Sequence, residues 1–322
     1  MRRIALCMSG GMRCYRQTVD SLRRNLIEAN PDCEFDLFLV TNEKVSHGSK
    51  DYQQPDAYGK RVSELYGPLM KRKEKPFSEA AAQEVYGDLL RRMEVWGDDQ
   101  PYGYFQILSM FWKIVRCDEI RMEYGREHDF EYDLVIRLRS DLLICTPLDL
   151  TPFFDKPGVM FQSWLYNPGE PRLVEPLMTL LEDESQPLAP LMPHPDAGGK
   201  FSDIMFWSDG PTMARMHGVT DFFLKFLNRF QKDKGLPPLT SHTPPPEYGG
   251  HPGSWDMLTL FYLRFKGITP HPGRTFLSFL VLHLVLEQGV TIRKEDLPEE
   301  FRRELLRAYF RDEPFTARLA LP

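Results

Sequence analysis

Short apolar runs recur along the first half of the chain, and each of them ends in glycine or polar residues. Residues 4–8, 37–40 and 134–138 are near-continuous stretches of aliphatic and aromatic side chains with the length of buried strands. Residues 104–124 repeat apolar side chains at helical spacing, and residues 15–28 also favour a helix. This succession of strands and helices predicts an α/β domain with a mixed sheet flanked by helices.

The rest of the pattern extends this prediction. The segments 167–200 and 236–253 are rich in Pro and Gly and are expected to form loops. The basic run 71–75 is interpreted as a solvated face. We expect one domain over residues 1–270, with a C-terminal helical extension, residues 271–322, packed on it. Further helices are expected at residues 59–71, 78–96, 211–230 and 257–266, and further strands at 158–164 and 201–209.

The run 134–138 carries the charges with the greatest potential for chemistry. Side chains alternate between the two faces of a strand, so Val135, Arg137, Arg139 and Asp141 would share one face if the strand extends that far. Two guanidinium groups and a carboxylate would then lie close together. A ligand site at the strand end is one interpretation, and an Arg–Asp ion pair that only closes the strand is the other.

Two other positions are candidates for a site: a glycine turn that could bind an anion, and a carboxylate at the start of a helix. Ser9-Gly10-Gly11 lies between the first strand and the first helix, where backbone N–H groups approach a ligand closely. An ordinary turn is the alternative. Asp256 falls in the first turn of an expected helix, a position that stabilises a carboxylate through the helix dipole.

Composition narrows the class of partner. The 322 residues are 42% hydrophobic and 27% charged, which is ordinary for a globular protein. The formal net charge of -6 argues against a nucleic-acid-binding protein, because such proteins need a basic footprint. An anionic ligand would therefore have to meet a local cluster of basic side chains.

Cysteine usage and the apolar segments indicate a compartment. Five cysteines without CxxC spacing predict neither a disulfide framework nor a cysteine zinc site, and are expected as thiols in a reducing compartment. Residues 4–8 are too short for the apolar region of a signal peptide, and residues 276–286 are too short to span a membrane. We therefore expect a cytoplasmic protein with no membrane insertion.

The order of residue types around Arg139-Ser140-Asp141 resembles GT-A-fold glycosyltransferases. In that family a buried strand ends in an Asp-x-Asp motif that holds a divalent metal against a nucleotide-sugar diphosphate. Arg139 stands at the first Asp position. The resemblance implies a Rossmann-like, GT-A-like fold, with Asp141 as a ligand of Mn or Mg. His251 is a further candidate ligand by residue type alone, and a histidine without a metal role is the alternative. Because arginine also neutralises a diphosphate, fixed arginines could replace the metal.

A second resemblance covers about residues 1–150. Glycosyltransferases of bacterial and large-virus surface glycans combine an "SGQxR"-like turn, a helix with Gln and Ser, and a "YDxVIRxRxD"-like strand. This chain has Ser9-Gly10-Gly11 with Arg13, then Ser109 and Lys113, and the strand just described; Gly11 stands at the Gln position. The resemblance implies that Ser9, Gly10 and Arg13 lie near the nucleotide. It also implies that Asp141 lies at the diphosphate. From their charge, Lys113, Arg137 and Arg139 are the candidates to neutralise that diphosphate together with Asp141.

Together these features predict a glycosyltransferase of glycan biosynthesis, either a hexosyl- or a pentosyltransferase. It would use a nucleotide-sugar donor and a glycan or other hydroxyl acceptor. The late strand and helix of GT-A enzymes imply Asp203 or Asp256 as the acceptor-facing base. Two alternatives remain open: a sugar-phosphate nucleotidyltransferase, and a non-catalytic glycan- or protein-binding protein on a degenerate transferase scaffold.

Overall fold

The structure is a computed structural model of the whole 322-residue chain. The part described below is residues 1–12, 14–41, 44–47, 50–53, 58–74, 80, 83–84, 104–162, 204–220, 259, 262–263, 266–268, 270–272, 279–281, 299, 303–304 and 307.

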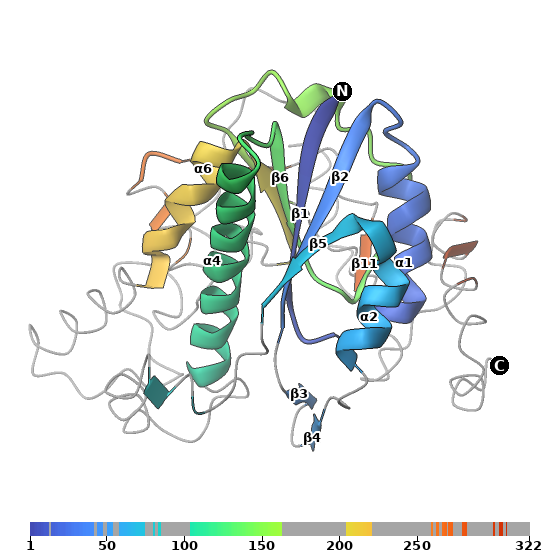
Figure 1. The fold of residues 1–322 in the computed structure, drawn as a ribbon, viewed down its shortest axis with the longest axis vertical. Coiled ribbons are helices and arrows are strands. Elements are labelled where there is room, and N and C mark those ends of the chain that lie inside the picture. The colour runs from blue at the N-terminus through green and yellow to red at the C-terminus, as the bar shows by residue number, and fades with distance from the viewer. Residues whose placement is uncertain are drawn as a thin grey trace, which may run out of the picture.

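A seven-stranded mixed sheet forms the centre of the molecule, with the strand order β10-β8-β9-β6-β1-β2-β5 (Figure 1). Strand β1 pairs in parallel with both of its neighbours, whereas β9 runs antiparallel to β6 and β8. The predicted α/β class with a mixed sheet and flanking helices is confirmed. The strands are β1 (Arg2–Gly10), β2 (Cys33–Thr41), β5 (Met70–Lys73), β6 (Leu134–Leu138), β8 (Met160–Gln162), β9 (Met205–Ser208) and β10 (Pro270–Pro272).

Helices cover both faces of this sheet. In Figure 1, α4 and α6 lie on one side of the strands and α1 and α2 on the other. Helix α1 continues directly into the π-helix η1, so that the helix predicted over residues 15–28 is confirmed almost to its end. The helical elements are α1 (Tyr15–Leu22), η1 (Arg23–Ile27), α2 (Tyr58–Tyr66), η2 (Gly67–Leu69), α4 (Tyr104–Glu127), η3 (Thr151–Phe153), α6 (Gly210–Ala214) and η5 (Arg215–Gly218).

The two faces of β6 pack into two separate apolar clusters, as the period-two pattern predicts. Leu134, Ile136 and Leu138 belong to the cluster that also holds residues of α1 and α2. Val135 belongs to the cluster built on the α4 side, with Phe111 of that helix. Burying each such side chain contributes about 1.5–3 kcal/mol to folding. The alternation therefore places Arg137, the one charged residue of β6, on the same face as Val135.

Strand β5 corrects one prediction. The sequence predicted a helix to residue 71, but α2 ends at Tyr66 and residues 70–73 form an edge strand parallel to β2. The basic run predicted to be solvated has Lys71 and Lys73 exposed on this strand. Exposed and half-buried positions alternate along β5, which is the period of a strand. Because β5 lies at the sheet edge, it tolerates the charges that had suggested a helix.

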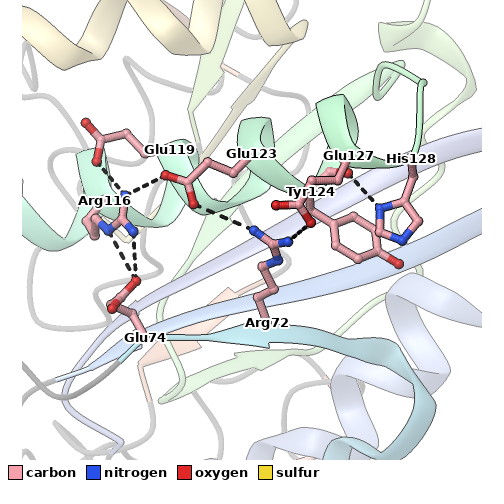
Figure 2. Close-up of polar contacts among 8 residues, drawn as sticks. All are labelled: Arg72, Glu74, Arg116, Glu119, Glu123, Tyr124, Glu127 and His128. Atoms are coloured by element: carbon pink, nitrogen blue, oxygen red, sulfur yellow. Dashed lines mark hydrogen bonds and ion pairs between the residues drawn. The ribbon is translucent and has the colours of Figure 1, made fainter.

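A network of ion pairs joins β5 to α4 (Figure 2). Arg116 of α4 reaches Glu74 at 2.9 Å and Glu123 at 2.9 Å, and Arg72 of β5 pairs with Glu123 and Glu127. These side chains are partly exposed, so each pair contributes about 0–1 kcal/mol. The network accounts for much of the charge that the sequence places in this region.

Two smaller sheets complete the described strands. Strand β7 (Leu142–Ile144) pairs antiparallel with β11 (Phe279–Val281), and β3 (Lys44–His47) pairs with β4 (Lys50–Gln53). The prediction that residues 276–322 are helical is therefore wrong at β11. Strand β10 lies across the boundary predicted at residue 270 and pairs with β8 of the main sheet. Most of the helix predicted over residues 78–96 falls outside the described residues.

All five cysteines are free thiols, as expected. Burial raises the pKa of Cys7 and of Cys145, so both thiols are held in their neutral form. None of the helices in the described ranges combines the length and apolar character that a membrane span requires.

Candidate active site

The carboxyl ends of the three neighbouring strands β6, β1 and β2 lie side by side along the same border of the sheet, which is called the site edge below. Strand β1 is between the other two and parallel to both, with Met8 opposite Leu138 and Gly10 opposite Thr41. The prediction that these three strand ends meet is thus confirmed. In open α/β sheets, ligands bind in the crevice outside the carboxyl ends of the strands. Every described residue of the candidate site lies at this edge or on the helices that pack beside it.

The connection from β1 to α1 has an unusual backbone. Gly10 has φ +122°, a conformation that side-chain-bearing residues rarely adopt, and Cys14 has φ +49° at the start of α1. Such backbone geometry persists where the surroundings hold it in place, and it is frequent at ligand sites. Glycine is therefore the residue that this backbone conformation favours at position 10.

Arg137 is the buried cation of β6. Its side chain is 2% exposed, and Nε donates to Ser9 Oγ at 3.2 Å. The guanidinium also lies 5.8 Å from the centroid of the Phe206 ring. The structure thus brings together Arg137 and Ser9, two of the residues predicted to serve the donor.

Lys113 of α4 is a second buried cation near the same edge. It is 3% exposed and donates to Ser109 Oγ at 2.8 Å. One turn later along α4, the Cys117 thiol lies within hydrogen-bonding distance of the carbonyl oxygens of Met8 and Phe38, so this face of the helix contacts the sheet. Four helical residues rise about 6 Å. Because α4 runs antiparallel to β1, Lys113 lies close to the level at which β1 and β2 end.

Arg139 and Asp141 pair with each other in the turn that follows β6. Arg139 Nε donates to Asp141 Oδ1 at 2.9 Å, and Nη2 donates to Oδ2 at 2.7 Å. Asp141 is 1% exposed, whereas the Arg139 side chain is 23% exposed. Strand β6 ends at Leu138, so the extension of the strand to Asp141 is wrong. The turn, and not strand alternation, brings these two groups together.

The described residues do not fit a metal site at Asp141. Both oxygens of this carboxylate accept hydrogen bonds from Arg139. Within the described ranges, no group of three or more His, Cys, Asp and Glu side chains could hold a metal ion. The donor set that GT-A resemblance implied, with Mn or Mg on Asp141, is therefore not assembled by these residues, and the carboxylate acts on an arginine instead.

Three hydrogen bonds hold the turn that carries Arg139 and Asp141, and the sequence did not reveal them. The Arg139 N–H donates to Ile204 O at 3.1 Å. Ser140 Oγ donates to Gly11 O at 2.7 Å, and Thr18 Oγ1 of α1 donates to Ser140 O at 2.6 Å. In the sequence, the serine between Arg139 and Asp141 indicates only that a hydroxyl is present in the charged motif. Its partners, Gly11 and Thr18, are distant in the chain and could not be predicted from it.

The amino ends of the same strands, far from the candidate site, have their own polar contacts. Asp133 accepts from Arg2 Nη1 at 2.7 Å and from the Arg3 N–H at 2.8 Å. Tyr132 donates to the buried carboxylate of Asp36 at 2.6 Å. Burial, together with this hydrogen bond, raises the pKa of Tyr132. These groups join strands at their amino ends and provide a matched comparison for the candidate site.

Four predicted site residues lie outside the described residues: Arg13, Asp203, Asp256 and His251. Their roles stay predictions. Ile204, the described residue that follows Asp203 in the chain, is the acceptor for the Arg139 N–H.

No protein-family model and no curated protein matches this chain. Solved structures that are similar to this chain include mouse xyloside xylosyltransferase 1 in its apo form. The two sequences are 14% identical, the match covers 84% of each chain, and the TM-score is 0.41. The galactosyltransferase LgtC with donor and acceptor sugar analogs has 13% identity, covers 84% of this chain and 73% of its own, and has a TM-score of 0.38. At these values, the likeness assigns neither a family nor an activity to this chain.

Proposed function

We propose that this protein is a glycosyltransferase that moves a sugar from a nucleotide-diphosphate donor to a hydroxyl acceptor. The observation that carries the proposal is the placement of Arg137, Arg139 and Lys113 around the carboxyl ends of parallel strands. In a chain with a net charge of -6, this local cluster of cations is the feature that favours an anion.

The donor diphosphate would lie along this edge, at the Gly10 turn. Arginine contacts phosphate oxygens through paired N–H groups, which fix orientation as well as neutralise charge. The Ser9 hydroxyl already holds Arg137, and the Asp141 carboxylate already holds Arg139. Both guanidinium groups are therefore oriented before a ligand binds, which lowers the entropy cost of binding it.

In the proposed reaction, an oxygen of the acceptor forms a bond to the anomeric carbon of the donor sugar. The bond from that carbon to the diphosphate oxygen breaks, and the nucleoside diphosphate leaves with the electron pair. The acceptor proton passes to a base. Arg137 and Arg139 would stabilise the negative charge that develops on the leaving group, where preorganised donors have their largest effect on rate.

We assign the base to Asp203 in preference to Asp256. The support is indirect: the neighbour of Asp203 in the chain, Ile204, is hydrogen bonded to the backbone of Arg139. A carboxylate base is needed if the configuration at the anomeric carbon inverts.

Charge neutralisation by arginine makes a divalent metal unnecessary in this proposal. Asp141 would orient Arg139, whose guanidinium donates to both oxygens of this carboxylate. A chelator is therefore expected to leave the transfer rate of the parent protein unchanged.

The test is a panel of nucleoside-diphosphate sugars, first for thermal stabilisation and then for turnover. A bound donor at 100 times its Kd stabilises the folded state by about 2.7 kcal/mol, which a melting curve detects. Release of nucleoside diphosphate that depends on a hydroxyl acceptor supports the proposal. Release of pyrophosphate from a nucleoside triphosphate and a sugar phosphate would indicate a nucleotidyltransferase. Stabilisation by glycans without any nucleotide effect would indicate a binding protein.

A further inference from the structure

A seam of buried polar side chains on α1, on η1 and at Asn30, just after η1, holds the chain that follows β6. Ser21 Oγ accepts from the Ile144 N–H at 3.2 Å, and Asn25 Nδ2 donates to Ile144 O at 2.7 Å. Further along, Asn30 donates to Leu148 O at 2.7 Å and accepts from the Leu150 N–H at 2.9 Å. The seam therefore holds the segment from Ile144 to Leu150 at regular intervals.

The amino-terminal end of this seam contacts the candidate site itself. Thr18 donates to Ser140 O at 2.6 Å, and Ser140 donates through its own hydroxyl to Gly11 O at 2.7 Å. Ser140 and Thr18 are each 3% exposed. One serine thus joins three features: the glycine turn after β1, the turn with Arg139 and Asp141, and the helix α1.

We propose that Ser140 and Thr18 are positioning residues that set the distance between the glycine turn and the Arg139–Asp141 pair. This inference rests on the proposed function. A diphosphate that spans both turns requires them at a fixed separation, and they belong to segments 129 residues apart in the chain. Without the Ser140 hydroxyl, the two turns lose the side-chain hydrogen bond that joins them beyond the last strand pair, Met8 and Leu138.

The contacts also explain why a serine in particular is needed. Its hydroxyl is a donor to a carbonyl of a different segment, whereas its own carbonyl accepts from Thr18. Alanine would keep the second bond and lose the first. Small shifts of groups that orient a reacting substrate have large effects on rate and affinity. Ser140 therefore acts on the ligand through Gly11 and Arg139, without touching it.

The experiment compares Ser140→Ala with Ser21→Ala. Ser21 is also a buried hydroxyl of this seam. It accepts from the Ile144 N–H, beyond the site, and donates to the backbone carbonyl of Thr18 at 2.7 Å, but it contacts neither the Ser140 hydroxyl nor the Gly11 carbonyl in the hydrogen bonds described here. Both variants should lower the urea midpoint of unfolding. Only Ser140→Ala should weaken binding of the nucleoside-diphosphate sugar that stabilises the parent, by about 10-fold, which is about 1.4 kcal/mol. Equal donor affinity in Ser140→Ala and parent would overturn the inference, and so would equal weakening in Ser21→Ala.

Thr18 gives a second pair of variants should Ser140→Ala fail to fold. Thr18→Val keeps the shape and loses the hydroxyl, whereas Thr18→Ser keeps the hydroxyl. Donor affinity should fall in the first and be retained in the second. Loss of affinity in both would mean that packing of the side chain, and not its hydrogen bond, matters, and would overturn the role of Thr18.

Hydrogen exchange without ligand separates this inference from the proposed function. Amides of residues 10–12 and 139–142 should exchange faster in Ser140→Ala than in the parent, whereas Ser21→Ala should leave them unchanged. If the parent binds no nucleotide sugar, the proposed function fails while the exchange result still decides whether Ser140 links the two turns. Unchanged exchange in Ser140→Ala would refute that link.

Discussion

Replacement of Asp141 by Asn tests the proposed site most directly. Asn has nearly the same size and retains one acceptor, but its amide nitrogen is a donor and would face a donor of Arg139. One of the two charge-assisted hydrogen bonds at 2.7 and 2.9 Å would be lost, together with the negative charge that orients the guanidinium. We expect the fold to survive and transfer to be abolished.

The expected loss of stability in Asp141→Asn depends on how exposed the Arg139–Asp141 pair is. A hydrogen bond to a charged group contributes about 1.5–3 kcal/mol, and because the Arg139 side chain is 23% exposed, the lower figure is the better one here. A folded protein with a stability of roughly 5–15 kcal/mol tolerates this loss. In contrast, kcat/KM should fall at least about 100-fold, equivalent to roughly 2.7 kcal/mol of transition-state stabilisation.

Asp133→Asn is the matched control. Asp133 also contacts an arginine side chain, but at the amino end of the same pair of strands. Urea unfolding should show a lowered midpoint in both variants, and the transfer assay should show a loss only in Asp141→Asn. Full transfer activity in Asp141→Asn would refute the reasoning and favour the binding-protein alternative. Activity that requires added Mn or Mg, and that extra metal partly restores in the variant, would show instead that Asp141 is a metal ligand.

Three further outcomes are expected. Arg139→Ala should weaken donor binding by about 1.5–3 kcal/mol in a titration. It should also lower the urea midpoint, because the buried Asp141 carboxylate loses both hydrogen bonds from Arg139; a lowered midpoint with normal donor affinity would make Arg139 an ion-pair residue only. Gly10→Ala, at φ +122°, should lower the free energy of unfolding by on the order of 1–3 kcal/mol and should also weaken binding of the nucleotide-sugar donor. Gly158→Ala, at φ +80°, is the control and should lower stability alone. Because the raised pKa of Tyr132 keeps its proton in the folded state while the unfolded chain loses it above about pH 10, stability should fall with pH there, and Tyr132→Phe should make that slope shallower by up to about 1.36 kcal/mol per pH unit. An unchanged slope would contradict the Tyr132 assignment.

Local pattern was enough to predict the central strands and the long helix. The run over β6 had the composition of a strand buried on both faces, and its alternation placed Val135 and Ile136 in different clusters. The residues of α4 repeat with the period of a helix, and that period is a property of neighbours in the chain. The ends of β1 and β6 were predicted to meet for a different reason: each buried run ends in glycine or polar residues, as strands that line a ligand crevice do.

The contacts that build the site depended on the tertiary structure. Arg137 meets Ser9 from 128 residues away, and Ser140 meets Gly11 from 129 residues away. No local period encodes such a pairing, because it depends on which strands become neighbours. The same reason explains the error at β5, whose charged residues form a strand only because β2 offers them an edge to pair with. The sequence by itself determined the elements and the kinds of side chain at their ends, and only the packing of distant segments decided which of those side chains touch.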